Sequence, residues 1–293
     1  MFKIYMPEYK EPLFRPPAEA DSLIFQVAYG CPHNTCRFCG MYKGVRYSLR
    51  GMEEALAEFI KSAEYYPETR RIFLADGDVM LLPFEMLKTY LVALNSLFPR
   101  LARVNVYANG SSILDKSDEE LAALKKLKLN TLYLGLETGS QKILDLVNKG
   151  EKVNVMVDAI KRAQKHGLRC SVMFLLGLGG KEYSAEHIRL TAAALNEMQP
   201  ILLSALRFVE VPNTGMFDGF KTLSEYEAVK ELRDIIAGLE LKKTIFRANH
   251  RSNPIPLEGR FPNNKQDLLN LLDAQLASGE LDKNGPGMTP LFL

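Results

Sequence analysis

Three cysteines stand close together near the start of the chain, at Cys31, Cys36 and Cys39, in the spacing C-x4-C-x2-C. A fourth, Cys170, lies far from them in an apolar run. Clustered thiolates bind soft metals, and three of them can each hold one iron of a four-iron cluster. The fourth iron would then have no protein ligand. We expect this open coordination position to be the place where chemistry occurs.

The spacing leaves other interpretations open. A plant-type ferredoxin shares the first spacing but needs a fourth cysteine, and Cys170 is better explained as a packed core residue. A structural zinc site could recruit His33, although this residue lies between the first two cysteines, outside the usual paired spacing. A non-enzymatic iron–sulfur or zinc-binding protein with a structural cysteine loop is therefore the main alternative to an enzyme.

Repeating strand and helix units must position this loop. Short apolar runs alternate with segments whose apolar residues recur at helical spacing. The predicted strands are 23–28, 71–75, 104–108, 131–136, 170–176 and 202–209, and the predicted helices are 52–66, 83–98, 117–128, 141–147, 153–166 and 185–198. We expect Ser117 to be an N-cap and Gly167 a left-handed C-cap. This alternation predicts an α/β fold with a parallel sheet, while periodicity leaves open whether the sheet is open or a barrel.

The pattern weakens after residue 219. A helix at 223–239, a short strand at 244–248, a loop at 249–262 and a leucine-rich final helix are expected there. We therefore predict an N-terminal extension over 1–21, a core domain over 22–219 and an appendage on the same domain over 220–293.

Composition narrows the class of protein. The 37 basic and 35 acidic residues are interspersed and leave a net charge of +2, so no field of one sign is available for a polyanion and nucleic acid is not indicated. No apolar run has the length of a membrane span, and the first residues lack a signal-peptide pattern. A cytoplasmic protein without membrane association is the expectation.

The cysteine loop, its place after the first strand and Phe38 before its last cysteine resemble the radical S-adenosylmethionine (radical SAM) superfamily, with similar motifs over about residues 22–215. The resemblance implies a partial (β/α)6 TIM-like barrel. It also implies an oxygen-sensitive enzyme with one [4Fe–4S] cluster and S-adenosylmethionine (SAM) as cofactors. Reduced flavodoxin or ferredoxin would supply an electron, SAM would be cleaved, and a 5′-deoxyadenosyl radical would abstract hydrogen from a substrate. A porphyrin substrate is a minority alternative, because residues 135–140 resemble oxygen-independent coproporphyrinogen oxidases.

Site residues follow from the same resemblance. Residues 74–78 stand where the family has Gly-Gly-Glu, and although this sequence departs from that motif, its glycine would still let the backbone approach the methionine amino group. Glu137 matches the residue that grips the ribose hydroxyls, and a carboxylate can accept both bonds; a helix N-cap is its other interpretation. The implied cofactor-binding set is Phe38, Asp76, Gly77, Asp78, Asn109, Glu137, Leu176, Gly177 and Val209.

Substrate groups are expected at the carboxyl ends of the strands. Arg207 lies in an apolar strand, so an anionic partner is expected: the SAM carboxylate, the substrate or Glu210. His250, in the loop 249–253, could shuttle a proton. Arg207 and His250 are the catalytic candidates.

Overall fold

The computed structural model describes residues 5, 7–211 and 214–283. It has an α/β fold with an eight-stranded sheet in the order β1-β4-β5-β6-β7-β8-β9-β10. The strands are β1 (Leu23–Gln26), β4 (Arg71–Ala75), β5 (Arg103–Tyr107), β6 (Leu129–Glu137), β7 (Arg169–Leu176), β8 (Leu202–Arg207), β9 (Ile245–Arg247) and β10 (Glu258–Arg260). The pairs from β1 to β6 and from β7 to β9 are parallel, and β10 runs antiparallel to its neighbour β9. The order does not return to β1, so this sheet is open.

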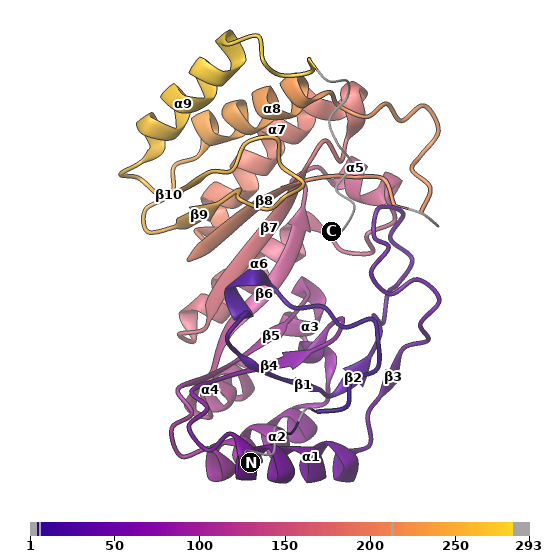
Figure 1. Cartoon of the computed structure of the whole chain (residues 1–293), viewed down its shortest axis with the longest axis vertical. Helices are drawn as coiled ribbons and strands as arrows, with labels where there is room; N and C mark the ends of the chain where they lie inside the picture. The colour runs from indigo at the N-terminus through magenta and orange to yellow at the C-terminus, as the bar shows by residue number, and fades with distance from the viewer. Residues whose placement is uncertain (1–4, 6, 212–213, 284–293) are drawn as a thin grey trace. The chain divides into compact units, whose positions relative to one another are not determined.

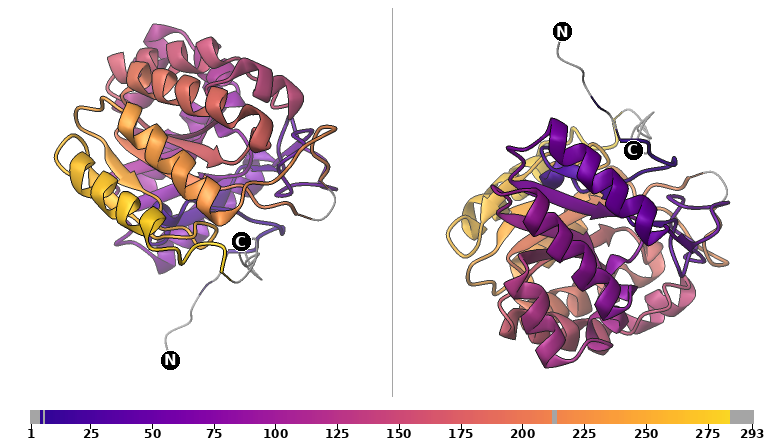
Figure 2. Two further views of the ribbon diagram at one scale, coloured as in Figure 1. Left: turned by 90° about the horizontal axis from the view of Figure 1, so that it is seen from above. Right: turned by 90° about the horizontal axis from the view of Figure 1, so that it is seen from below.

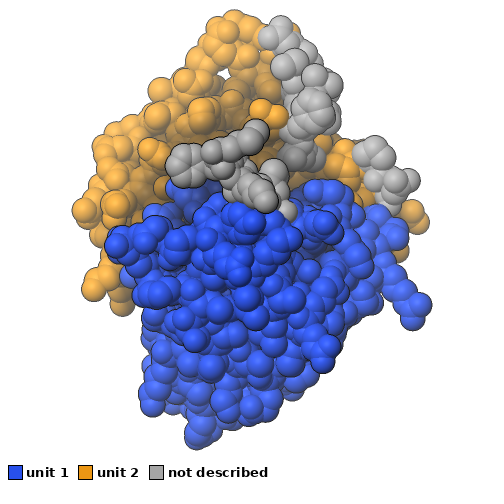
Figure 3. Space-filling model, turned by 60° about the horizontal axis from the view of Figure 1, so that its bottom comes forward, with its two compact units in different colours: residues 1–34, 41–134, 161–170 blue, residues 35–40, 135–160, 171–293 orange. Residues whose placement is uncertain are grey.

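The chain divides into two compact units, coloured separately in Figure 3. Unit 1 contains residues 1–34, 41–134 and 161–170, and unit 2 contains residues 35–40, 135–160 and 171–293. The division into an extension, a core domain and an appendage stays a prediction. Parts of each predicted domain, at 1–4, 6, 212–213 and 284–293, lie outside the described residues.

In unit 1, α1 (Met52–Tyr65) and α2 (Phe84–Leu97) lie side by side along the sheet (Figure 1). Aromatic packing holds them there, because the ring of Phe25 on β1 lies 4.6 Å from that of Phe59 on α1 and 6.2 Å from that of Phe98. Each such fully buried ring contributes about 1.5–3 kcal/mol relative to an exposed one. This core fixes the strands whose ends carry the candidate site.

Successive side chains of a strand point to opposite faces, so Ile24 faces away from Phe25. The chain segment that precedes β1 covers this second face. Tyr9 and Leu13 pack against the cluster that contains Ile24, and Tyr9 Oη donates to the carbonyl of Ile24 at 3.1 Å. Farther along, the buried carboxylate of Glu19 accepts from Asn105 Nδ2 at 2.7 Å.

Unit 2 contains the helices that follow the later strands. They are α5 (Gln141–Leu146), α7 (Gly180–Met198), α8 (Glu225–Gly238) and α9 (Lys265–Ala277), and α6 (Val153–Lys165) begins here and ends in unit 1. α8 packs between α7 and α9 (Figure 2, left).

Most predicted elements are present. The predicted strand 23–28 divides into β1 and β2 (Ala28–Tyr29), and β2 pairs with β3 (Ser48–Leu49) across the cysteine loop. The Ser117 cap is confirmed at the start of α4 (Asp118–Lys126), and Gly167 has the expected positive φ of 76°. β8 ends at Arg207 rather than at Val209. The short elements η1 (Pro17–Glu19), η2 (Val79–Leu81) and α3 (Gly110–Leu114) have no counterpart in the prediction, and β10 lies within the segment 249–262 that was predicted to be a loop, because it pairs with β9.

Candidate active site

In unit 1 the first cysteine is held by the turn after β4. The amide of Gly77 donates to the carbonyl of Gly30 at 3.0 Å. A Cβ atom on Gly77 would lie 2.5 Å from the Cα of Cys31, closer than real Cβ atoms approach. Only glycine therefore allows the turn to lie against the cysteine loop at this point.

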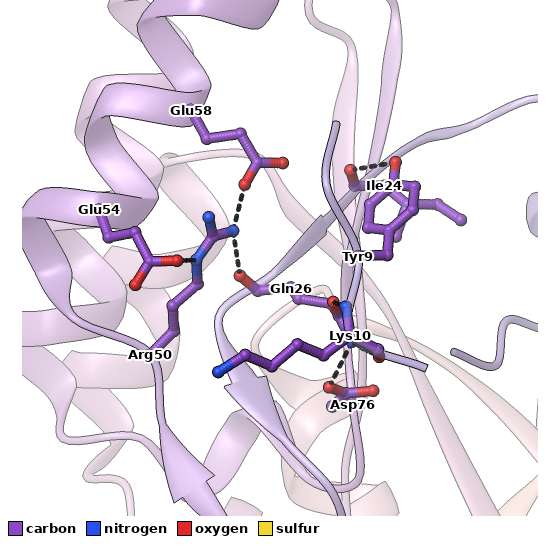
Figure 4. Close-up of polar contacts among 8 residues, drawn as sticks. All are labelled: Tyr9, Lys10, Ile24, Gln26, Arg50, Glu54, Glu58 and Asp76. Carbon is purple, nitrogen blue, oxygen red and sulfur yellow. Dashed lines mark hydrogen bonds and ion pairs between the residues drawn. The ribbon is translucent and has the colours of Figure 1, made fainter. Parts of the chain in front are cut away.

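Asp76 precedes this glycine and has a φ of 84°. Its carboxylate is 1% exposed and accepts a hydrogen bond at each oxygen, from Tyr42 Oη at 3.0 Å and from Gln26 Nε2 at 3.0 Å. Burial raises the pKa of Asp76 to about 6, although the two hydrogen bonds oppose this rise. Gln26 also exchanges bonds with the backbone of Lys10 (Figure 4), so Asp76 belongs to a fixed network.

The end of the cysteine loop is anchored by Arg50, directly after β3. Its guanidinium pairs with Glu58 and, at 2.9 Å, with Glu54, both on α1, and it donates to the carbonyl of Gln26 at 3.2 Å (Figure 4). Sequence reasoning missed this residue. Its signal was the acidic residues at four and eight positions after Arg50, which share one helix face.

Asp78 and Asn109, both predicted site residues of unit 1, are brought together. One oxygen of Asp78 accepts from Asn109 Nδ2 at 3.2 Å and the other from Ser112 Oγ at 2.9 Å. Ser112 Oγ also accepts from the backbone amide of Asn109 at 3.1 Å, at the start of α3. The ends of β4 and β5 are thus joined by side chains.

In unit 2 the second half of the cysteine loop is attached to the end of α5. The amide of Arg37 donates to the carbonyl of Val147 at 2.8 Å, and Asn148 Nδ2 donates to the carbonyl of Thr35 at 3.2 Å. The ring of Phe38 packs on the apolar cluster that includes Val147, Leu175, Leu178 and Phe208. The segment 35–40 is therefore held by backbone and apolar contacts.

Glu137, the last residue of β6, forms a buried ion pair that the sequence did not reveal. Its Oε1 lies 3.0 Å from Nζ of Lys149, and the side chains are 4% and 12% exposed. Its Oε2 is buried without a hydrogen-bond partner among the described residues. Burial alone would lower the pKa of Lys149, but the negative charges of Glu137 and Cys36 outweigh it and raise this pKa.

A second buried network lies behind the predicted turns of unit 2. The amide of Gly177 donates to Oε1 of Glu231 at 2.6 Å, and Ser184 Oγ donates to the same carboxylate. Burial raises the pKa of Glu231 to about 7 and lowers that of His187 to about 3. Nδ1 of His187 lies 2.8 Å from Oγ1 of Thr138, after β6, and its Nε2 lies 3.6 Å from Oε1 of Glu231, so these residues connect the turns after β6 and β7.

Leu176 and Arg207 pair in register at the ends of β7 and β8, and Val209 follows β8 half-buried. Arg207 Nη2 donates to the carbonyl of Leu223 at 2.9 Å, and burial lowers its pKa against the attraction of Glu225 and Asp282. Glu210, one of the anionic partners considered for Arg207, accepts from the hydroxyl of Thr222 at 2.9 Å.

His250 is half-buried, with its Nδ1 2.8 Å from Oγ of Ser252. Burial and the nearby charge of Arg251 lower its pKa. The loop that carries it is anchored to β8, because Asn253 Nδ2 donates to the carbonyl of Ala205 at 2.8 Å. The predicted catalytic candidates therefore both lie at or beside β8.

The donor set fits an iron–sulfur cluster. All four cysteines are thiols. Within the described ranges no three His, Cys, Asp or Glu side chains gather around one point where a single metal ion would bind. Each cysteine ligand of a four-iron cluster binds a different iron, so these thiols need not meet at one point. Cys170 is fully buried in β7, and burial raises its pKa to about 12, as expected for a core residue.

Residues 25–192 match the family model for the radical SAM superfamily. The matched region is more than half of the chain and includes the three loop cysteines, the turn after β4 and Glu137. The chain therefore belongs to the radical SAM superfamily of enzymes. Membership implies a [4Fe–4S] cluster and SAM as cofactors, together with an electron donor and a substrate. Arg207 and His250 lie outside the match.

An uncharacterized methyltransferase from Pyrococcus horikoshii is 28% identical over 165 residues, which are 54% of this chain and 34% of that protein. The FeFe-hydrogenase maturase HydG from Carboxydothermus hydrogenoformans has a TM-score of 0.52 at 21% identity, over 85% of this chain and 56% of its own. Coproporphyrinogen III oxidase (HemN) from Escherichia coli has a TM-score of 0.55 at 16% identity, over 74% of this chain and 51% of its own. The chain spans about a third of the curated relative and about half of each of these structures. The structural likeness confirms the predicted fold.

None of the helices in the described ranges is both long and apolar enough to cross a membrane.

Proposed function

We propose that the chain reductively cleaves SAM at a [4Fe–4S] cluster held by Cys31, Cys36 and Cys39. The observation that carries this proposal is the backbone fixation of both parts of the cysteine loop. In unit 1, Gly77 contacts Gly30 and Cys31 through backbone atoms. In unit 2, the segment 35–40 bonds to residues 147–148. Ligands held by such outer contacts keep their orientation when metal binds.

When bound, the cluster and SAM would supply a 5′-deoxyadenosyl radical that abstracts hydrogen from the substrate. Glu137 would accept hydrogen bonds from the ribose hydroxyls through its buried Oε2. Phe38, Leu176 and Val209 would form apolar walls for the adenine, and the turn at Gly177 would be held by Glu231. Excluding water with these walls strengthens each polar contact to the ligand.

The turn after β4 would bind the methionine amino group through its backbone at Gly77. Asp76 and Asp78 would shape this turn, because their oxygens already accept hydrogen bonds from other residues of unit 1. Asn109 would act through Asp78. Arg207 would pair with a carboxylate of SAM or of the substrate, since a buried guanidinium is stabilised by an anion. His250, whose loop is anchored to β8, would shuttle a proton near Arg207.

Anaerobic reconstitution tests the proposal. Cluster-loaded protein given dithionite and SAM is expected to release 5′-deoxyadenosine, and Cys36→Ala should abolish both the release and most of the bound iron. Cys170→Ala is the matched control, because it removes a buried thiol outside the loop and should keep both. Wild-type protein that binds iron but releases no 5′-deoxyadenosine would contradict the proposal. Reduced flavodoxin and ferredoxin can then replace dithionite as donors.

Methyl transfer is a second candidate reaction, favoured by the similarity over 165 residues to the uncharacterized methyltransferase from Pyrococcus horikoshii. In that reaction the methyl group of SAM passes to an acceptor and S-adenosylhomocysteine is left. The same assay should therefore record both products by chromatography. Formation of S-adenosylhomocysteine that depends on an added acceptor would support this candidate, whereas 5′-deoxyadenosine alone would support hydrogen abstraction.

A further inference from the structure

Lys149 lies where the cysteine segment of unit 2 meets the carboxylate at the end of β6. Its Nζ is 3.0 Å from Oε1 of Glu137 and 5.9 Å from the ring centre of Phe38, within the range of a cation–π contact. Its carbonyl accepts from the thiol of Cys36 at 3.9 Å. One lysine thus contacts a predicted cluster ligand, a predicted adenine neighbour and a predicted ribose ligand.

We propose that Lys149 is a positioning residue that orients Glu137 for the ribose of SAM and whose positive charge makes the cluster easier to reduce. This inference rests on the proposed function. The reduction is the transfer of one electron from dithionite, flavodoxin or ferredoxin to the cluster. The added electron increases negative charge beside the cysteines, so a fixed cation nearby stabilises the reduced state.

The geometry of Glu137 supports the first part. The ammonium of Lys149 occupies Oε1, and Oε2 stays buried without a partner in the described structure. Buried polar atoms are nearly always hydrogen-bonded, so an exception at a strand end indicates a place for a ligand group. Glu137 also holds a φ of 63°, a backbone strain that is common at ligand sites.

Gly135 shows that the pair is built into the strand end. A Cβ atom there would lie 2.0 Å from Oε1 of Glu137 and 3.2 Å from Nζ of Lys149. Any larger side chain at this position would therefore displace the ion pair.

The electrostatic part depends on where the charge lies. The carbonyl of Lys149 lies 3.9 Å from Sγ of Cys36, its ammonium lies 5.9 Å from the ring centre of Phe38, which directly precedes Cys39, and the lysine is mostly shielded from water. A charge in such a place is screened less than one on the surface. A purely structural ion pair would instead affect only stability, and buried pairs often add little of it compared with apolar residues.

The experiment compares reconstituted wild type with Lys149→Met, Lys149→Arg, Glu137→Gln and the double variant Glu137→Gln/Lys149→Met. The double variant leaves no unpaired buried charge, so it keeps the test valid if Lys149→Met folds poorly. Lys152→Met, an exposed lysine on the same segment, is the control. The readouts are the midpoint potential of the cluster from a redox titration followed by electron paramagnetic resonance, SAM affinity by calorimetry, and thermal unfolding.

Lys149→Met is expected to weaken SAM binding about tenfold and to lower the reduction equilibrium constant about tenfold, which is about 59 mV more negative for one electron. The double variant should have a midpoint potential about 59 mV more negative than that of Glu137→Gln, because these two variants differ only in the charge of Lys149, and Lys149→Arg should keep the wild-type potential. Wild-type values of both quantities in Lys149→Met, with or without a loss of thermal stability, would overturn the proposal. An unchanged SAM affinity alone would overturn the positioning of Glu137 by Lys149, and an unchanged midpoint potential alone would overturn the effect of its charge on reduction. Failure of the wild type itself to bind a cluster or SAM would instead reject the proposed function.

Discussion

Asp76 and Glu137 are two buried carboxylates at the ends of parallel strands: Asp76 follows β4 in unit 1, and Glu137 ends β6 in the part of that strand that belongs to unit 2. Both have positive φ angles, 84° and 63°. Asp76 accepts a hydrogen bond from a neutral donor at each oxygen, whereas Glu137 pairs with a lysine at one oxygen and has no described partner at the other. The two carboxylates, each at the end of a strand of the same sheet, therefore differ in their hydrogen-bond partners. The first carboxylate is satisfied by the fold, whereas the second has one oxygen without a described partner, which in our proposal accepts hydrogen bonds from the ribose of SAM.

The largest expected effect comes from the turn beside Asp76. Gly77→Ala would place a methyl group 2.5 Å from the Cα of Cys31. The same methyl group would lie 2.6 Å from the carbonyl oxygen of Gly30. Because both of these neighbouring atoms belong to the backbone, the turn and the loop must separate, which should cost about 1–3 kcal/mol of folding stability. We expect loss of most of the iron after reconstitution, measured by iron and sulfide assays together with denaturant unfolding.

Gly215→Ala is the control for this change, since apart from its chain neighbours no described atom lies within 4 Å of a Cβ added there. Full iron content in Gly77→Ala would show that the turn does not hold the cysteine loop. The turn that carries Asp76 would then have no structural role toward the cysteines.

An intermediate effect is expected from Glu137→Gln. The glutamine keeps the shape of the side chain but removes its charge, so the ribose loses a charge-assisted acceptor worth about 1.5–3 kcal/mol. SAM affinity measured by calorimetry should fall roughly ten- to hundredfold. Glu197→Gln, on the exposed side of α7, should leave it unchanged. Equal affinities in all three proteins would mean that Oε2 is not the ribose acceptor.

The features of the fold that depend on local sequence patterns could be predicted from the sequence. Buried parallel strands are apolar runs, so β4 and β7 were found at nearly their observed bounds. The cysteine spacing likewise predicts a metal-binding loop from local sequence alone, and its three ligands stay a prediction. Capping chemistry is also local, which is why Ser117 was assigned correctly.

Partners that are distant in the sequence were not predictable. Gln26 is 50 residues from Asp76, and Lys149 is 12 residues from Glu137 across a whole helix, with no periodic spacing to connect them. Whether a carboxylate is satisfied or open depends on these partners. The sequence could therefore propose Asp76 and Glu137 as equal candidates but could not separate their roles.

The smallest effect on ligand binding is expected from Asp76→Asn, where pH is the sharper measurement. Burial raises the pKa of Asp76 to about 6 in the folded protein, above an unfolded value of about 3.9. Proton binding therefore favours the folded state, and this stabilisation is fully present below about pH 4 and is lost as pH rises through about 6.

Between about pH 4 and pH 7 the free energy of unfolding of wild type should accordingly fall by about 2–3 kcal/mol relative to that of Asp76→Asn, measured by denaturant unfolding at each pH. Its SAM affinity should differ from that of the variant by less than about threefold, because both carboxylate oxygens already bond within unit 1. Asp21→Asn, at an exposed aspartate, should show neither change. A large loss of SAM affinity in Asp76→Asn would place this carboxylate beside Glu137 as a ligand group and remove the contrast between the two strand ends.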